Sequence, residues 1–168
     1  MNSSRLSRIA LAGAAATLAG LLLAPGAEAQ TVKQAAQAKP AKASAEATHK
    51  VAIQVNQNDK AVMDLALNNA KNVIDYYKEK GETVAIEIVT YGPGLHMLRA
   101  DTSPVKDRIG PMALENPGIK FIACGNTQLN QSKAEGKEVT LMSEATVMPS
   151  GAVRLMELQA QGYAYIRP

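Results

Sequence analysis

The sequence predicts an α/β domain in which helices cover a parallel β-sheet on both faces. Within residues 50–168, short apolar segments alternate with segments of helical length. This alternation is typical of a parallel sheet, because two parallel strands need a long crossover connection, usually a helix. The expected strands are also almost continuously apolar, as strands buried on both faces are.

The expected strands are short and bounded by turn-forming residues. They cover residues 50–55, 84–89, 119–123, 145–148 and 163–166. The clearest helix follows Asp59, a residue that favours a helix N-terminus, and apolar residues recur in it at three- and four-residue steps. Gly81 is expected to end this helix.

A short helical turn and three further helices are expected between the later strands. Residues 95–99 predict a short helical turn, and Ser103 followed by Pro104 predicts the start of a helix. Gly110-Pro111 is expected to kink that helix or split it in two. A helix from about Cys124 should end at Gly136, and the last helix should begin after Pro149-Ser150-Gly151.

The N-terminal segment predicts export. Residues 1–29 begin with a positively charged segment, which is followed by an apolar run that is too short for a typical membrane span. They end in Ala27-Glu28-Ala29, which resembles a signal-peptidase cleavage site. We expect Sec-type export to the periplasm, cleavage after Ala29, and no membrane span thereafter. Residues 30–49 predict a flexible Ala/Lys/Gln-rich linker, in which His49 has no expected role.

Charge and composition exclude several classes of protein. The chain carries a net charge of +3, but bases and acids are equal in number within residues 50–168, so no nucleic-acid partner is expected. One cysteine and two histidines without ligand spacing predict no metal site. The chain lacks the Walker and dinucleotide-binding glycine motifs and the nucleophile elbow, so no cofactor is expected.

The candidate site lies where the strands end, because ligands of open parallel sheets bind beyond the carboxyl ends of the strands. Cys124 is the candidate catalytic residue, since a thiol at the start of a helix has a lowered pKa and is more nucleophilic. It could instead be a buried structural residue. Asn126 could donate an N–H to the sulfur, and His96 could act as a base. The remaining rim residues are Tyr91, Gly92, Gly94, Gly125, Thr127, Ser150 and Gly151.

Several segments together resemble the DsrE/DsrF-like proteins. The resemblance spans nearly all of residues 50–168 and depends on the order and spacing of short motifs. They are Val51-Ala52-Ile53-Gln54-Val55, Leu65-Ala66-Leu67-Asn68-Asn69-Ala70, Tyr91-Gly92-Pro93-Gly94-Leu95, Phe121-Ile122-Ala123-Cys124-Gly125-Asn126-Thr127, Pro149-Ser150-Gly151 and Gly162-Tyr163-Ala164-Tyr165-Ile166-Arg167-Pro168.

The resemblance implies a three-layer α/β/α fold with a five-stranded, mainly parallel sheet, assembled as a trimer or hexamer. It also implies kinship with sulfur-relay proteins, in which a cysteine after a central strand carries a persulfide, and Cys124 stands at the matching place. The known relay members are cytoplasmic, whereas this chain has an export signal, and its Cys124-Gly125-Asn126-Thr127 segment is typical of a less characterised branch.

Three functions remain open at the level of the sequence. The first is a periplasmic, sulfurtransferase-like sulfur carrier that exchanges sulfur through Cys124 with donor and acceptor proteins. The second is a non-catalytic, oligomeric protein that binds a small molecule or supports assembly, with Cys124 structural. The third is a thiol redox sensor that dimerises through Cys124.

Overall fold

The computed structural model describes residues 47–168. The predicted signal peptide and all but the end of the predicted linker lie outside the described residues. No helix within residues 47–168 is long and apolar enough to cross a membrane.

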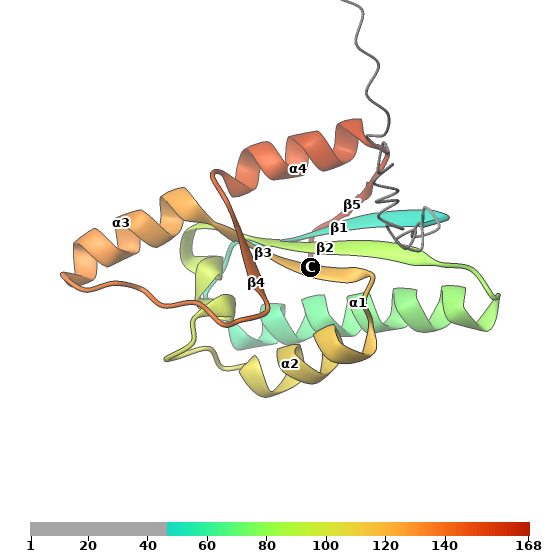
Figure 1. The fold of residues 1–168 in the computed structure, drawn as a ribbon, viewed down its shortest axis with the longest axis horizontal. Helices are drawn as coiled ribbons and strands as arrows, with labels where there is room; N and C mark the ends of the chain where they lie inside the picture. Colours follow the sequence, from blue (N-terminus) through green and yellow to red (C-terminus); the bar gives the residue numbers. More distant parts are fainter. Residues whose placement is uncertain (1–46) are drawn as a thin grey trace, which may run out of the picture. The chain divides into compact units, whose positions relative to one another are not determined.

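A five-stranded, all-parallel sheet forms the centre of the described domain (Figure 1). The strands lie in the order β4-β3-β2-β1-β5. Their bounds are β1 His49–Val55, β2 Val84–Thr90, β3 Ile119–Cys124, β4 Ala145–Met148 and β5 Ala164–Ile166. All five strands were predicted, and the predicted α/β class with a five-stranded parallel sheet is confirmed.

Helices cover both faces of this sheet, giving three layers. Figure 1 shows α1 and α2 on one face and α4 on the other, while α3 lies near the ends of the strands. The helices are α1 Lys60–Glu79, α2 Lys106–Glu115, α3 Gly125–Glu135 and α4 Gly151–Ala160, and a 3₁₀ helix, η1, spans Gly92–Leu98. The predicted turn at 95–99 is therefore part of a longer 3₁₀ segment.

The predicted boundaries of α1 are confirmed at both ends. The Asp59 side chain accepts a hydrogen bond from the backbone N–H of Ala61 at 2.8 Å, which satisfies a donor at the helix start. At the other end, Gly81 follows the cap with a φ of 73°, a conformation that favours glycine.

Two apolar clusters of unequal size hold the layers together. The larger cluster joins the sheet to α1, η1 and α2, and includes Ile53, Leu67 and Phe121. The smaller cluster, against α4, has five buried members, which are Ala52, Val89, Ile122, Leu155 and Leu158. The α4 face therefore gains less stabilisation from apolar burial than the α1/α2 face.

The structure corrects two expectations for α2. Val105, not Ser103, occupies the N-cap position, and no side chain caps the helix. The Ser103 hydroxyl donates to the Met97 carbonyl at 2.5 Å and accepts from the N–H of Val105, the residue before the helix, at 3.4 Å. The helix is also one unbroken element that contains Pro111, so of the two outcomes predicted for Gly110-Pro111, a kink or a split, the split is wrong. Pro111 has no N–H and so removes one hydrogen bond from the helix. The helix stays continuous because Ile109 and Met112 are buried against the core.

The expectation that His49 belongs to the linker and has no role is also wrong. His49 is the first residue of β1 and is paired with Val84 of β2. Its ring stacks on Tyr77 with 3.7 Å between centroids, and its Nε2 atom bonds the carboxylate of Glu82. The folded domain thus begins at least one residue earlier than the sequence predicted.

Candidate functional site

Cys124 lies where β3 ends and α3 begins. It is the last residue of β3, it is paired with Met148 of β4, and it occupies the N-cap position of α3. The residue is 5% exposed, so solvent has little access to the sulfur. Its position after a central strand agrees with the prediction from the sequence.

The surroundings of the Cys124 thiol favour its ionised form. Burial by itself raises the pKa of the thiol. Hydrogen bonds from the Thr127 hydroxyl and from the backbone N–H groups of Gly151, Thr127 and Asn126 act in the opposite direction and outweigh it. The net result is a pKa below the ordinary value of 9.0, which increases the fraction of thiolate at neutral pH.

The hydroxyl of Thr127 connects the thiol to the loop after β2. Its Oγ1 atom accepts a hydrogen bond from the backbone N–H of Gly92 at 3.0 Å. A hydroxyl carries a single proton, so an oxygen that accepts from Gly92 has its own proton free to donate to the sulfur of Cys124. Gly92 has a φ of 53°, which orients this N–H at low cost only in a glycine.

The start of α4 supplies a second set of backbone donors close to the thiol. Ser150 caps this helix, accepting from the Val153 N–H at 3.4 Å. A Cβ atom placed on Gly151 would lie 3.0 Å from the Cβ of Tyr91 and 3.3 Å from the Cβ of Cys124. Glycine at this position therefore lets the N-terminus of α4 approach the sulfur closely.

Two further predicted rim residues act through the backbone. The N–H of Asn126 also donates to the Pro149 carbonyl at 3.2 Å, which ties α3 to the loop after β4. Gly94 makes room for the protein itself, because a Cβ at Gly94 would lie 2.2 Å from the carbonyl oxygen of Val55. Gly94 is therefore explained by packing against β1 and not by ligand approach.

The remaining predicted glycine, Gly125, is also close to β4. A Cβ at Gly125 would lie 3.2 Å from the Cγ1 atom of Val147 and 3.4 Å from the Met148 carbonyl oxygen. The structure thus brings together the three predicted rim loops, after β2, β3 and β4, around Cys124.

His96 does not join this arrangement. It lies on η1 and lines a separate pocket, whose lining residues do not include Cys124. The groups that act on the Cys124 thiol are Thr127, Gly151 and Asn126, and no described hydrogen bond joins the thiol to His96. Nothing in this geometry supports His96 as the base for Cys124.

Reasoning from sequence missed a polar network on the α4 face of the sheet. Gln54, which is 7% exposed, donates through Nε2 to the Tyr91 hydroxyl at 2.5 Å and accepts from the Tyr165 hydroxyl. Glu87, which is 3% exposed, forms a bidentate ion pair with Arg154 of α4. The Arg154 Nε and Nη2 atoms lie 2.8 and 2.6 Å from the two carboxylate oxygens. A signal was present, because Gln54 and Glu87 are polar residues inside otherwise apolar strands.

The described residues offer no arrangement for a metal ion. Within residues 47–168, no group of three or more His, Cys, Asp or Glu side chains is placed to hold one. The chemistry available at Cys124 is that of a thiol whose ionisation is favoured by hydrogen-bond donors from two helix N-termini and one hydroxyl.

The comparisons with known proteins support the fold and leave the activity open. No family model and no curated protein sequence matches the chain. A solved structure of a protein of unknown function from Methanobacterium thermoautotrophicum is similar, with 29% sequence identity and a TM-score of 0.61. The match covers 71% of this chain and 99% of the archaeal chain. The described domain therefore shares its fold, over nearly its whole length, with a protein whose function is unknown.

Proposed function

We propose that this protein is a periplasmic sulfur carrier of the DsrE/DsrF-like type, in which Cys124 holds sulfur as a persulfide. One observation carries the proposal: the Thr127 hydroxyl and backbone N–H groups from α3 and α4 all act on the Cys124 sulfur. These donors favour a negative charge on sulfur, and the thiolate is the form of cysteine that attacks a sulfur–sulfur bond.

The proposed reaction transfers one sulfur atom without net oxidation. The Cys124 thiolate attacks the outer sulfur of a donor persulfide, forming a new S–S bond. The S–S bond of the donor breaks, and the donor leaves as a thiolate with the bonding electron pair. An acceptor thiolate then attacks the outer sulfur on Cys124, and Cys124 leaves as a thiolate. The donors at the site stabilise the anionic sulfur before and after each transfer.

A second function is favoured by the burial of the thiol. Cys124 is 5% exposed, and cysteine often fills space in a core without any chemistry. In this reading the domain is a non-catalytic, oligomeric protein that binds a small molecule or supports assembly. A disulfide between two chains would require two such buried sulfur atoms to come within bonding distance of each other, so the redox-sensor function is the least supported of the three.

A persulfide-loading experiment separates the two functions. The purified full-length protein and its Cys124→Ser variant would be treated with glutathione persulfide and analysed by mass spectrometry. The carrier function predicts that the native protein gains one sulfur atom, loses it to dithiothreitol and passes it to an added thiol. The variant should gain none.

Alkylation of Cys124 tests the alternative, in which the thiol is structural. If Cys124 gains no sulfur and reacts with iodoacetamide only after denaturation, the carrier function is wrong and the thiol is structural. The serine variant must keep the native far-UV circular dichroism spectrum, so that a loss of loading reports on the sulfur atom and not on unfolding.

Location and assembly are separate parts of the proposal. Export with cleavage after Ala29 predicts a periplasmic protein whose first residue is Gln30, which N-terminal sequencing would test. Assembly as a trimer or hexamer predicts a light-scattering mass of three or six mature chains. A mass of one chain would contradict the assembly.

A further inference from the structure

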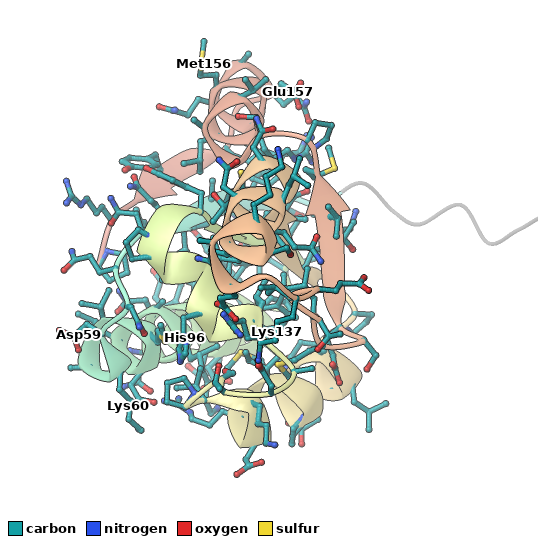
Figure 2. The ribbon with its side chains drawn as sticks, turned by 90° about the vertical axis from the view of Figure 1, so that its left-hand side faces the viewer. Asp59, Lys60, His96, Lys137, Met156 and Glu157 are labelled. Carbon is teal, nitrogen blue, oxygen red and sulfur yellow. The ribbon has the colours of Figure 1, made fainter. Side chains whose placement is uncertain are left out.

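A pocket of about 420 Å³ lies between η1 and α3, apart from the Cys124 site. We call it the η1–α3 pocket. Its lining residues come from the loop after β1, from η1 and the segment that follows it, and from α3. They are Asn58, Pro93, His96, Arg99, Thr102, Gln131 and Glu135. Figure 2 looks at this end of the domain and labels His96 and Lys137 there. The volume falls in the usual range for small-molecule sites.

Arg99 and Glu135 of the pocket wall belong to a charged cluster that also includes Asp101 and Lys137 beside the pocket. The Arg99 side chain is 8% exposed and donates to both carboxylate oxygens of Asp101, each at 2.9 Å. It also donates to both oxygens of Glu135, in one case at 3.0 Å. One guanidinium thus serves two carboxylates and has almost no donors left for an anionic ligand.

Both carboxylates remain ionised at neutral pH. Hydrogen bonding to Arg99 holds the pKa of Asp101 and that of Glu135 below their usual ranges. The three groups together therefore carry one negative charge. The Glu135 side chain is 33% exposed, and each carboxylate oxygen has a second acceptor position.

Lys137 balances this charge loosely. Its Nζ atom lies 3.9 Å from Oδ2 of Asp101 and 3.9 Å from Oε2 of Glu135, and its side chain is 64% exposed. These distances are long for a direct hydrogen bond. A ligand ammonium group could replace Lys137 at little cost, since an exposed ion pair of this kind contributes little stability.

A second, independent feature of the wall also requires a donor. The Oε1 atom of Gln131 is buried and has no hydrogen-bond partner among the described residues. Its Nε2 atom is already used, donating to the Gly92 carbonyl at 3.2 Å. A buried acceptor left without a donor is costly, and a bound N–H or O–H group would remove that cost.

We propose that the η1–α3 pocket binds a small ammonium-bearing molecule. The ammonium group lies against Glu135 at the pocket wall, where it competes with the neighbouring Lys137 for the carboxylate. A second donor of the ligand satisfies Gln131 through rotation of its side-chain amide. This proposal does not depend on the sulfur-carrier function, because no residue of the pocket acts on the Cys124 sulfur.

Three small probes of similar size test the charge preference. The full-length protein would be titrated with 2-aminoethanol, ethylene glycol and glycolate, which are cationic, neutral and anionic. Backbone amide NMR signals would report binding. We expect 2-aminoethanol alone to shift the signals of Gln131 and its neighbours in a saturable way. No response to 2-aminoethanol up to roughly 100 mM, or an equal response to all three probes, would overturn the proposal, since so small a ligand binds only weakly even at a suitable site.

Three variants test the residues. Glu135→Gln should weaken 2-aminoethanol binding several-fold, and Lys137→Gln should strengthen it several-fold by removing the competing cation. Glu138→Gln changes another exposed acid on the same segment and should leave binding unchanged. The Lys137→Gln variant keeps the test valid if Glu135→Gln fails to fold. Unchanged or weaker binding in Lys137→Gln, or equal weakening in Glu135→Gln and Glu138→Gln, would contradict the assigned position of the ammonium group.

Discussion

At the scale of single residues, Thr127 has the largest consequence for the chemistry of Cys124. Its hydroxyl accepts from the N–H of Gly92 at 3.0 Å, and this bond orients the proton toward the sulfur. The backbone donors near the thiol belong to the main chain, so an ordinary change of side chain leaves them in place. Thr127 is the one donor to the sulfur that is a side chain, so it can be tested directly.

Replacement of Thr127 by valine keeps the shape of the side chain and removes the hydroxyl. We expect Thr127→Val to raise the pKa of the Cys124 thiol and to slow its alkylation at neutral pH about ten-fold, because a hydrogen bond to a charged group contributes about 1.5–3 kcal/mol. The rate of iodoacetamide alkylation against pH would measure both effects. Thr127→Ser, which keeps the hydroxyl, is the control, and an unchanged profile in the valine variant would refute this role.

At the scale of elements, the two faces of the sheet are stabilised in different ways. Helices α1 and α2 bury a large apolar cluster, whereas α4 has a small one and α3 has no buried residue. Polar contacts therefore contribute much to the attachment of α3 and α4. For α4 the main contact is the buried ion pair between Glu87 and Arg154.

Removal of Glu87 tests this dependence. Glu87→Ala leaves Arg154 without its buried partner, and we expect the free energy of unfolding to fall by about 3 kcal/mol. Glu157 binds the same arginine at 3.3 Å from an exposed position, so Glu157→Ala should cost less than about 1 kcal/mol. Urea unfolding of both variants would measure the difference. Equal losses would show that the buried pair does not hold α4.

At the scale of the whole molecule, ionised carboxylates connect segments that are distant in the chain. Asp64 of α1 pairs with Arg108 of α2, and Arg99 joins Asp101 to Glu135 of α3. Hydrogen bonds to Lys60 and Arg108 lower the pKa of Asp64, and those to Arg99 lower the pKa of Asp101 and of Glu135. These acids release their protons more readily in the folded chain than in the unfolded chain.

Stability should therefore fall in acid. A folded pKa below the unfolded value means that the stabilisation is complete above the ordinary values of 3.8 and 4.5. It is then lost as the pH falls through the lower, folded values. The urea midpoint, measured from pH 7 down to about pH 3, should decrease mainly below about pH 4.5. An Asp101→Asn, Glu135→Gln double variant should show a smaller decrease, and a profile identical to that of the native protein would contradict this account.

Local patterns in the chain were sufficient to predict the fold class and most of its elements. All five strands, the start of α1 at Asp59 and its end at Gly81 follow from short-range spacing and from capping or turn residues. The start of α2 could not be predicted in this way, because the Ser103 hydroxyl bonds the Met97 carbonyl of η1 and the N–H of Val105, and no side chain caps the helix itself.

The candidate site was determined in part by sequence and in part by tertiary structure. The position of Cys124 between a strand and a helix was evident from the sequence, since it depends only on adjacent residues. The grouping of Thr127, Gly92 and Gly151 near the sulfur requires that strands β2, β3 and β4 end side by side. The order of the strands in the sheet could not be predicted from local sequence patterns. The separation of His96 from Cys124, and the pairing of Glu87 with Arg154, likewise follow from long-range packing. Side chains far apart in sequence meet only once the order of the strands and the face covered by each helix are set, and those are properties of the whole fold.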